Sequence, residues 1–114
     1  MDIQSKIYQN HVRTLNDQFR HLGVGQGSFT LTEGISEKGA AFVHGVITTV
    51  RNFSAFSSDN DPHNEHDFGA FQYEGEKLFF KIDYYDLSLK AHSPNAADPK
   101  QTHRVLTVML ASEY

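Results

Sequence analysis

The chain has 114 residues, no cysteine and a formal net charge of −4. This length predicts one domain, residues 1–114, and 39% hydrophobic with 21% charged residues is the composition of a folded globular protein. The absence of thiols excludes disulfides, Cys-ligated zinc and a cysteine nucleophile, and it favours a reducing compartment. No apolar run reaches the roughly 18 residues of a membrane span, and residues 1–10 lack a signal-peptide core, so we expect a cytoplasmic protein with no membrane partner.

The negative charge is concentrated in the middle of the chain. Residues 57–86 contain two lysines and eight carboxylates, a net charge of −6, whereas the segments on either side are nearly neutral. A nucleic-acid-binding protein would show a basic patch instead, so direct contact with nucleic acid is not expected. The acidic segment permits a cation site or a basic protein partner.

An apolar stripe with helical spacing opens the chain. Its members recur every three or four residues, which predicts a helix over residues 3–22: Ile3, Ile7, Tyr8, Val12, Leu15, Phe19 and Leu22. Asp2 suits the cap at its start, and Gly23 suits the left-handed residue that ends many helices. The opposite face is predicted to be exposed and carries Lys6, Arg13, Asn16, Asp17 and Arg20.

Residues 28–53 predict a short strand followed by a helix. Residues 28–32 alternate, with Phe29 and Leu31 on one side, as in a strand. Ser36 then suits the cap of a helix that extends to residue 53 with one apolar face: Ala40, Val43, Val46, Ile47, Val50 and Phe53. Because β-branched residues dominate this segment and Gly45 weakens a helix, a strand over residues 36–53 is the alternative.

A polar loop and a β-hairpin follow. Residues 57–67 contain Pro62 and predict a loop, whereas residues 68–73 and 78–87 predict strands joined by a turn at residues 74–77. In the second strand, the even-numbered residues from 78 to 84 are predicted to face the core. A turn near Gly75 would place Asp67 beside Asp83.

Residues 98–110 predict a C-terminal helix. Asp98 and Pro99 suit its cap and first position, and Gln101 completes a capping box. An apolar stripe follows: Val105, Leu106, Met109 and Leu110. The predicted order is α-β-α-β-β-α, an α+β fold in which a small antiparallel sheet with a central hairpin is packed by N- and C-terminal helices.

Ionisable side chains are densest in residues 59–67. Imidazole and carboxylate together suit zinc, iron, nickel or manganese, so a divalent metal is the one cofactor that the sequence permits. The candidate ligands are His63, Glu65, His66, Asp67 and Asp83. Their spacing matches no established metal motif, and the alternative is a solvated acidic loop whose Asp and Asn side chains bond to their own backbone.

Four strings of the sequence resemble a family of small proteobacterial proteins. They are residues 60–62 (NDP), 65–69 (EHDFG), 81–86 (KIDYYD) and 104–111 (RVLTVMLA), with Glu113-Tyr114 closing the chain. The family is a domain of unknown function found in alphaproteobacteria and on their plasmids, and the resemblance runs from the first helix to the last residue. It implies no activity, but presence on mobile elements implies a role against host defence.

Two functions are therefore considered. The first is a binding module that occupies the basic nucleic-acid channel of a protein partner, as an inhibitor of a CRISPR or restriction complex would. Its contact residues would be Asp59, Asp61, Glu65, Asp67, Glu74 and Glu76. The second is a metal-dependent hydrolase that uses Glu65, His66, Asp67 and Asp83. The sequence favours the first, because no complete catalytic constellation is visible, and it does not indicate an oligomeric state.

Overall fold

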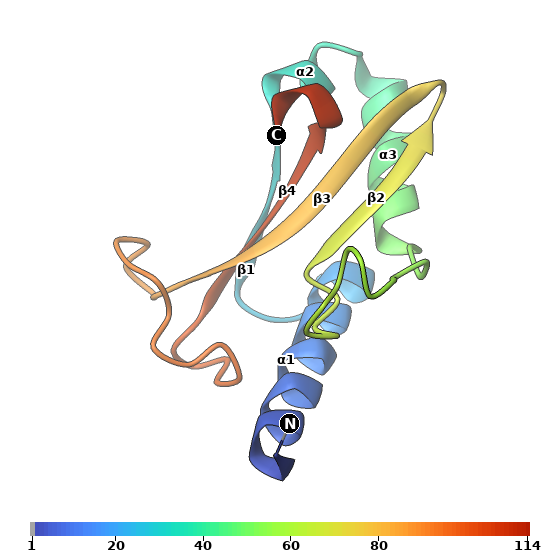
Figure 1. Cartoon of the computed structure of the whole chain (residues 1–114). Helices are drawn as coiled ribbons and strands as arrows, with labels where there is room; N and C mark the ends of the chain where they lie inside the picture. The colour runs from blue at the N-terminus through green and yellow to red at the C-terminus, as the bar shows by residue number, and fades with distance from the viewer. Residues whose placement is uncertain (1) are drawn as a thin grey trace.

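A computed structural model describes residues 2–114 and shows helices packed on a four-stranded sheet (Figure 1). The chain begins with helix α1 (Ile3–Leu22), strand β1 (Gly27–Leu31), the single turn of helix α2 (Glu33–Ser36) and helix α3 (Ala40–Arg51). Strands β2 (Phe68–Tyr73), β3 (Glu76–Tyr85) and β4 (His103–Leu110) follow, and the 3-10 turn η1 (Ala111–Glu113) ends the chain. Among the described residues, no helix is both long and apolar enough to cross a membrane.

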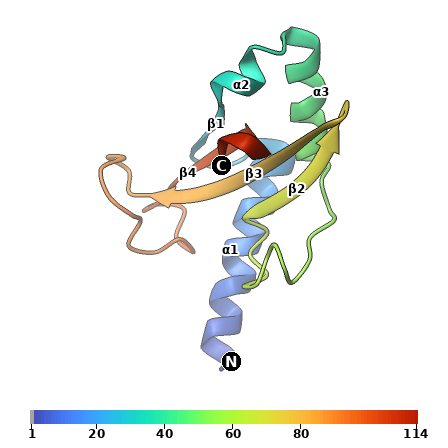
Figure 2. The same ribbon diagram turned by 45° about the horizontal axis from the view of Figure 1, so that its top comes forward.

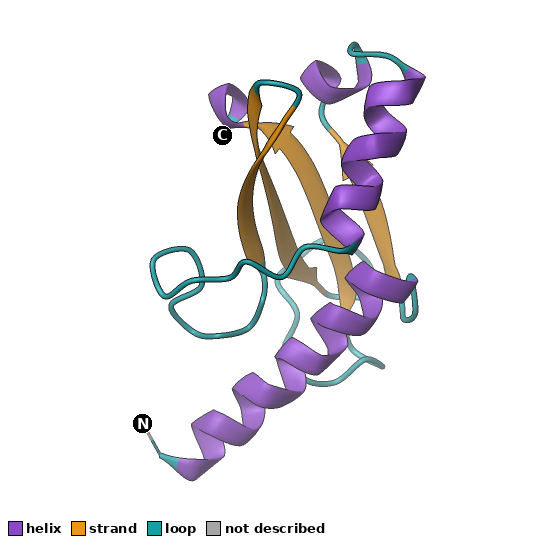
Figure 3. Cartoon of the chain, turned by 90° about the vertical axis from the view of Figure 1, so that its right-hand side faces the viewer, coloured by secondary structure: helices purple, strands orange, loops and turns teal. Residues whose placement is uncertain are grey.

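The sheet is mixed rather than antiparallel. Its strand order is β1-β4-β3-β2, and β1 runs parallel to β4 while the other pairs are antiparallel. The α+β class is therefore confirmed, and the prediction of a purely antiparallel sheet is wrong. Figure 3 shows α1 and α3 on one face of the sheet. On the other face, Tyr114 packs against Phe68 and Phe79.

The central hairpin forms as predicted. Phe68 pairs with Lys81 and Tyr73 with Glu76, so a two-residue turn joins β2 to β3. The turn residues Glu74 and Gly75 both have positive φ, at 49° and 81°, which matches the twist of a tight hairpin. The second strand lies two residues earlier than predicted, and its buried residues Leu78, Phe80 and Ile82 face the core.

The predicted C-terminal helix is wrong, because residues 103–110 form strand β4. The capping side chain does act locally, since Asp98 Oδ1 accepts the Lys100 N–H at 2.9 Å, but a turn follows instead of a helix. Arg104, Leu106 and Val108 are buried with a period of two. A central strand covered on both sides is apolar almost throughout, and such a run also contains a helix-like stripe.

Helix α3 confirms the predicted helix only over Ala40–Arg51. Its start is not at Ser36, because that residue ends α2 and Gly39 then adopts a φ of 98° that few other residues accept. A Cβ atom at Gly45 would collide with the ring and hydroxyl of Tyr73. Gly45 is therefore the position at which α3 approaches β2 closely, and its presence does not indicate a strand.

Helix α1 buries a different face from the one predicted. Asp2 caps it by accepting the Ser5 N–H at 2.7 Å, and Gly23 ends it with a φ of 69°, both as expected. Its buried residues begin at Val12, near the middle of the helix, and include two polar ones predicted on the exposed face: Val12, Asn16, Phe19 and Arg20. The first half projects beyond the sheet (Figure 2), which leaves Ile3, Ile7 and Tyr8 exposed.

The C-terminal ends of α1 and α3 meet and cap each other. Arg20 Nη1 donates to the carbonyls of Val50 at 2.9 Å and Phe53 at 2.8 Å, just where α3 ends. In return, Arg51 Nη1 donates to the carbonyl of Arg20 at 3.2 Å. Each guanidinium thus donates to one or more carbonyls near the end of the other helix and meets the negative end of that helix's dipole.

Candidate functional site

The loop of residues 57–67, here called the acidic loop, has a fixed shape. Asp61 is buried, and its carboxylate accepts the backbone N–H groups of Glu65 at 2.9 Å and His66 at 3.1 Å. Asp61, predicted as a partner contact, therefore organises the loop from within. Asp59 and His63 are exposed on the loop.

A buried polar network joins the acidic loop to α1, β3 and β4. Asn16, fully buried, donates from Nδ2 to the Glu65 carbonyl at 3.0 Å and to the Tyr84 hydroxyl oxygen at 2.9 Å. Its Oδ1 accepts Arg104 Nε at 2.6 Å. The Tyr84 hydroxyl donates to Glu65 Oε1 at 3.1 Å. Burial, followed by the nearby charges of Asp67 and Glu65, raises the pKa of Tyr84, so this phenol stays protonated at neutral pH.

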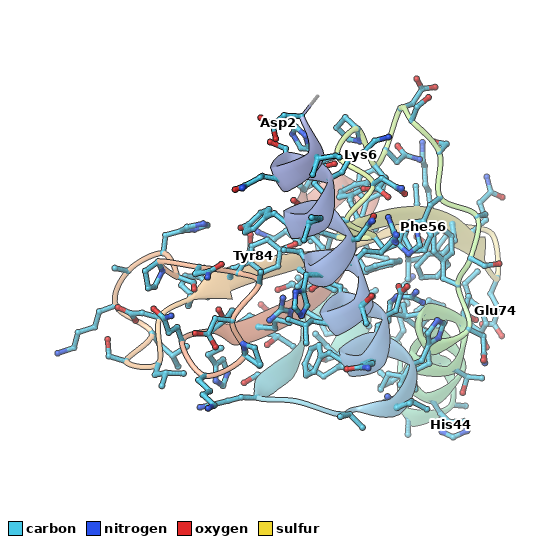
Figure 4. All side chains as sticks on the ribbon, turned by 90° about the horizontal axis from the view of Figure 1, so that it is seen from below. Asp2, Lys6, His44, Phe56, Glu74 and Tyr84 are labelled. Carbon is cyan, nitrogen blue, oxygen red and sulfur yellow. The ribbon has the colours of Figure 1, made fainter. Side chains whose placement is uncertain are left out.

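His66 is held by α1 and by an aromatic ring. Its Nδ1 lies 2.9 Å from Asp17 Oδ1, and its ring stacks on Phe56 with the centroids 3.9 Å apart. In the view of Figure 4, Phe56 and Tyr84 are seen on either side of α1.

Asp67 is the most strongly perturbed carboxyl group of the loop. It is half-buried, and among residues 2–114 its carboxylate makes no ion pair and no hydrogen bond to another residue. Burial raises its pKa to about 6, and the negative charges of Glu65 and Asp61 add to this effect. A carboxyl group whose pKa is raised in this way is a frequent feature of functional sites.

The five predicted metal ligands do not converge. Asp83 does not lie beside Asp67, because the β2–β3 register puts it on the sheet face of Phe79, where it pairs with Lys81 at 3.0 Å. Asp67 lies on the helix face, where its charge acts on Tyr84. Within residues 2–114, no three His, Asp or Glu side chains are arranged to hold a metal ion.

The six predicted partner-contact residues fall into two groups. Asp59, Asp61, Glu65 and Asp67 belong to the acidic loop, whereas Glu74 and Glu76 lie at the far end of β2, at the hairpin (Figure 4). Glu76 is paired with Lys38 Nζ at 3.1 Å. A six-residue strand is about 20 Å long, so the two groups do not form one patch.

An exposed apolar strip lies beside the acidic loop. It consists of Ile3, Ile7 and Tyr8, which are 74%, 61% and 41% exposed on the projecting half of α1. Tyr8 and Glu65 line the same surface pocket, so the projecting half of α1 and the acidic loop meet at Tyr8 to form a surface. We call this the α1–loop surface.

Replacing Asp2 by alanine should loosen this surface without unfolding the protein. The cap carboxylate is exposed and satisfies an N–H of the first turn, whose residues are all exposed. Hydrogen exchange should become faster at residues 4–8, while the thermal midpoint should not change. A lowered midpoint would show instead that the first half of α1 contributes to global stability.

Sequence reasoning missed the buried polar residues that organise the site. The sequence predicts Asn16 and Arg20 on an exposed helix face and Arg104 in a C-terminal helix, yet all three are buried and hydrogen-bonded. One signal was available: Val12, Asn16 and Arg20 are spaced by four, so the two polar residues share a face with a buried valine.

Comparison with known proteins supports the family resemblance. A family model described as "Protein of unknown function (DUF3768)" matches residues 31–113. The matched range contains α3, the acidic loop and strands β2–β4, whereas α1 lies before it. No curated protein and no solved structure matches the chain. The chain therefore belongs to the DUF3768 family of proteins of unknown function.

Proposed function

We propose that the protein is a non-enzymatic module that binds a protein partner through the α1–loop surface. The observation that carries the proposal is the apolar strip of Ile3, Ile7 and Tyr8, exposed on a helix that projects from the body. Apolar side chains grouped in this way commonly form the centre of a protein interface.

The charge of the acidic loop indicates the chemistry of the partner. Asp59, Glu65 and Asp67 make no ion pair within residues 2–114, although all three retain access to solvent. Lysine or arginine side chains of a partner would compensate them, and the uncharged strip would pack on an adjacent apolar patch. A basic nucleic-acid channel flanked by apolar surface has this character. That the channel belongs to a CRISPR or restriction complex rests on the resemblance to plasmid-borne proteins alone.

A metal-dependent hydrolase has less support. His66 is engaged by Asp17 and stacked on Phe56, and Asp83 is paired with Lys81 on the other face of the sheet. Glu65 and Asp67 alone would offer two carboxylates, which is fewer ligands than a catalytic zinc site uses.

The proposal is tested by placing a photo-crosslinking residue at position 7 of the full chain and identifying the captured protein in the source organism. The isolated partner should then lose at least about tenfold in affinity for Ile7→Glu, as expected for a residue at the centre of an interface. Asp59→Lys should weaken binding less than Ile7→Glu does. The effect of Asp59→Lys should be larger at low salt than at high salt, because salt screens the interaction between charges.

Leu87→Glu is the matched control. Leu87 is 50% exposed on the loop after β3, so the substitution adds the same charge at a similarly exposed apolar position outside the α1–loop surface. It should bind like the unmodified protein. Equal binding by Ile7→Glu and Leu87→Glu would contradict the proposal.

A further inference from the structure

A second surface pocket lies away from the acidic loop, between the end of α1 and the segments that precede β1 and β4. Its volume is about 190 Å³. The walls are mainly apolar and include Leu15, Phe19, Val24 and Pro99. None of these residues belongs to the α1–loop surface, so the pocket is independent of the proposed interface.

The one charged residue in this pocket is Arg104, which is only 3% exposed. Its Nε donates to Asn16 and its Nη2 donates to the Ala96 carbonyl, both at 2.6 Å. Within residues 2–114, Nη1 has no hydrogen-bond acceptor, no carboxylate lies within ion-pair distance, and yet this nitrogen is not fully buried. The carboxylate of Glu65 acts on this guanidinium only at longer range, and a buried charge without a directly paired anion is costly.

We propose that this pocket binds a small organic carboxylate with a compact apolar body. The carboxylate accepts a hydrogen bond from Arg104 Nη1, and the apolar body packs against Leu15, Phe19 and Val24. The size agrees with this class of ligand, because an apolar cavity of about 150 Å³ holds benzene. A phosphorylated nucleoside is too large for the pocket, and a free phosphate would leave its apolar walls unfilled.

The other contacts of Arg104 account for the position of its side chain, but they leave Nη1 without a hydrogen-bond acceptor. Asn16, Ala96 and the Tyr84 ring, 5.3 Å away, fix the guanidinium in place. This arrangement orients Nη1 before a ligand arrives, so little side-chain entropy is lost on binding.

Benzoate is the probe, and benzamide is its neutral counterpart of nearly the same shape. Both are titrated into the full, isotope-labelled chain and followed by NMR. Benzoate should shift the amide signals of Val24, Gly25 and Gln26 and the Nε–H signal of Arg104. Benzamide should bind at least about tenfold more weakly, a difference of about 1.4 kcal/mol, because it lacks the negative charge that attracts the guanidinium.

A pair of variants at Val24 locates the binding without disturbing the fold. Val24 is 54% exposed and lines the pocket, so either charge is tolerated there. Both variants remove the same apolar contact and differ in the sign of the added charge, so Val24→Glu should bind benzoate roughly threefold or more weakly than Val24→Lys. Equal affinity for benzoate and benzamide, shifts confined to other regions, or no difference between the two variants would each overturn the proposal.

Discussion

Replacing Arg20 by alanine is expected to lower the free energy of unfolding by about 3–5 kcal/mol. The side chain is 1% exposed and donates to the carbonyls of Val50 and Phe53, and its Nη2 pairs with Asp17 at 3.1 Å. Its guanidinium also lies 5.2 Å from the centre of the Phe56 ring. Alanine would leave a cavity beside that ring and would remove the donor to the Phe53 carbonyl and one of the two donors to the Val50 carbonyl, and both effects destabilise the folded state.

Chemical denaturation of a short series separates these two effects. Arg20→Met largely keeps the packing but removes the donors, so it should recover only part of the loss. Arg13→Ala is the control on the same helix, because Arg13 is half-buried and donates to the Asn64 carbonyl at 3.1 Å. It should cost about 1 kcal/mol or less. Similar losses for Arg13→Ala and Arg20→Ala would show that the mutual capping of α1 and α3 is not a major source of stability.

Replacing Asp67 by asparagine should have the opposite sign and stabilise the protein at pH 7 by about 2 kcal/mol. The physical reason is the half-buried carboxylate, which lies near Glu65 and Asp61 without a compensating cation. Asparagine keeps the shape of the side chain and removes the charge. The stabilisation is measured as the difference in unfolding free energy between the variant and the unmodified chain.

The pH dependence of this difference follows from the pKa of Asp67. Folding raises this pKa from 3.8 to about 6, so between these values the folded state binds more protons than the unfolded state. The contribution of Asp67 to stability therefore falls as the pH rises from about 4 to about 6. The advantage of Asp67→Asn should be absent near pH 4, grow through this window and stay constant above it.

Asp83→Asn is the control for the loss of a carboxylate. Asp83 is paired with Lys81 on the opposite face of the sheet, so its removal should give no stabilisation at pH 7. An advantage of Asp67→Asn that is the same at pH 4 and pH 7 would contradict the assignment of the effect to ionisation.

The Asp67 result also bears on function. A carboxylate that destabilises the folded protein is expected where a ligand or partner supplies the missing positive charge. If the partner of the α1–loop surface contributes that charge, its binding should be lower for Asp67→Asn even though the variant is more stable. This combination distinguishes a binding role from a purely structural one.

The sequence by itself determined the elements whose signals are local. The helix over residues 3–22 has a capping aspartate, a helical repeat and a terminal glycine, and the hairpin has alternating strands around a glycine turn. The negative charge of residues 57–67 was also evident, because charge needs no fold to be counted. These features depend on residues within a few positions of one another.

Tertiary structure decided what depends on distant partners. Residues 103–110 become a strand because β1 and β3 pair with them on both sides, and their apolar run alone does not distinguish a strand from a helix. Arg20 is buried because α3 ends beside it, and Asn16 because Arg104, Tyr84 and the acidic loop converge on it. The exposed strip on α1 exists because the first half of that helix projects beyond the sheet, and no periodicity in α1 records where the surface that it packs against ends.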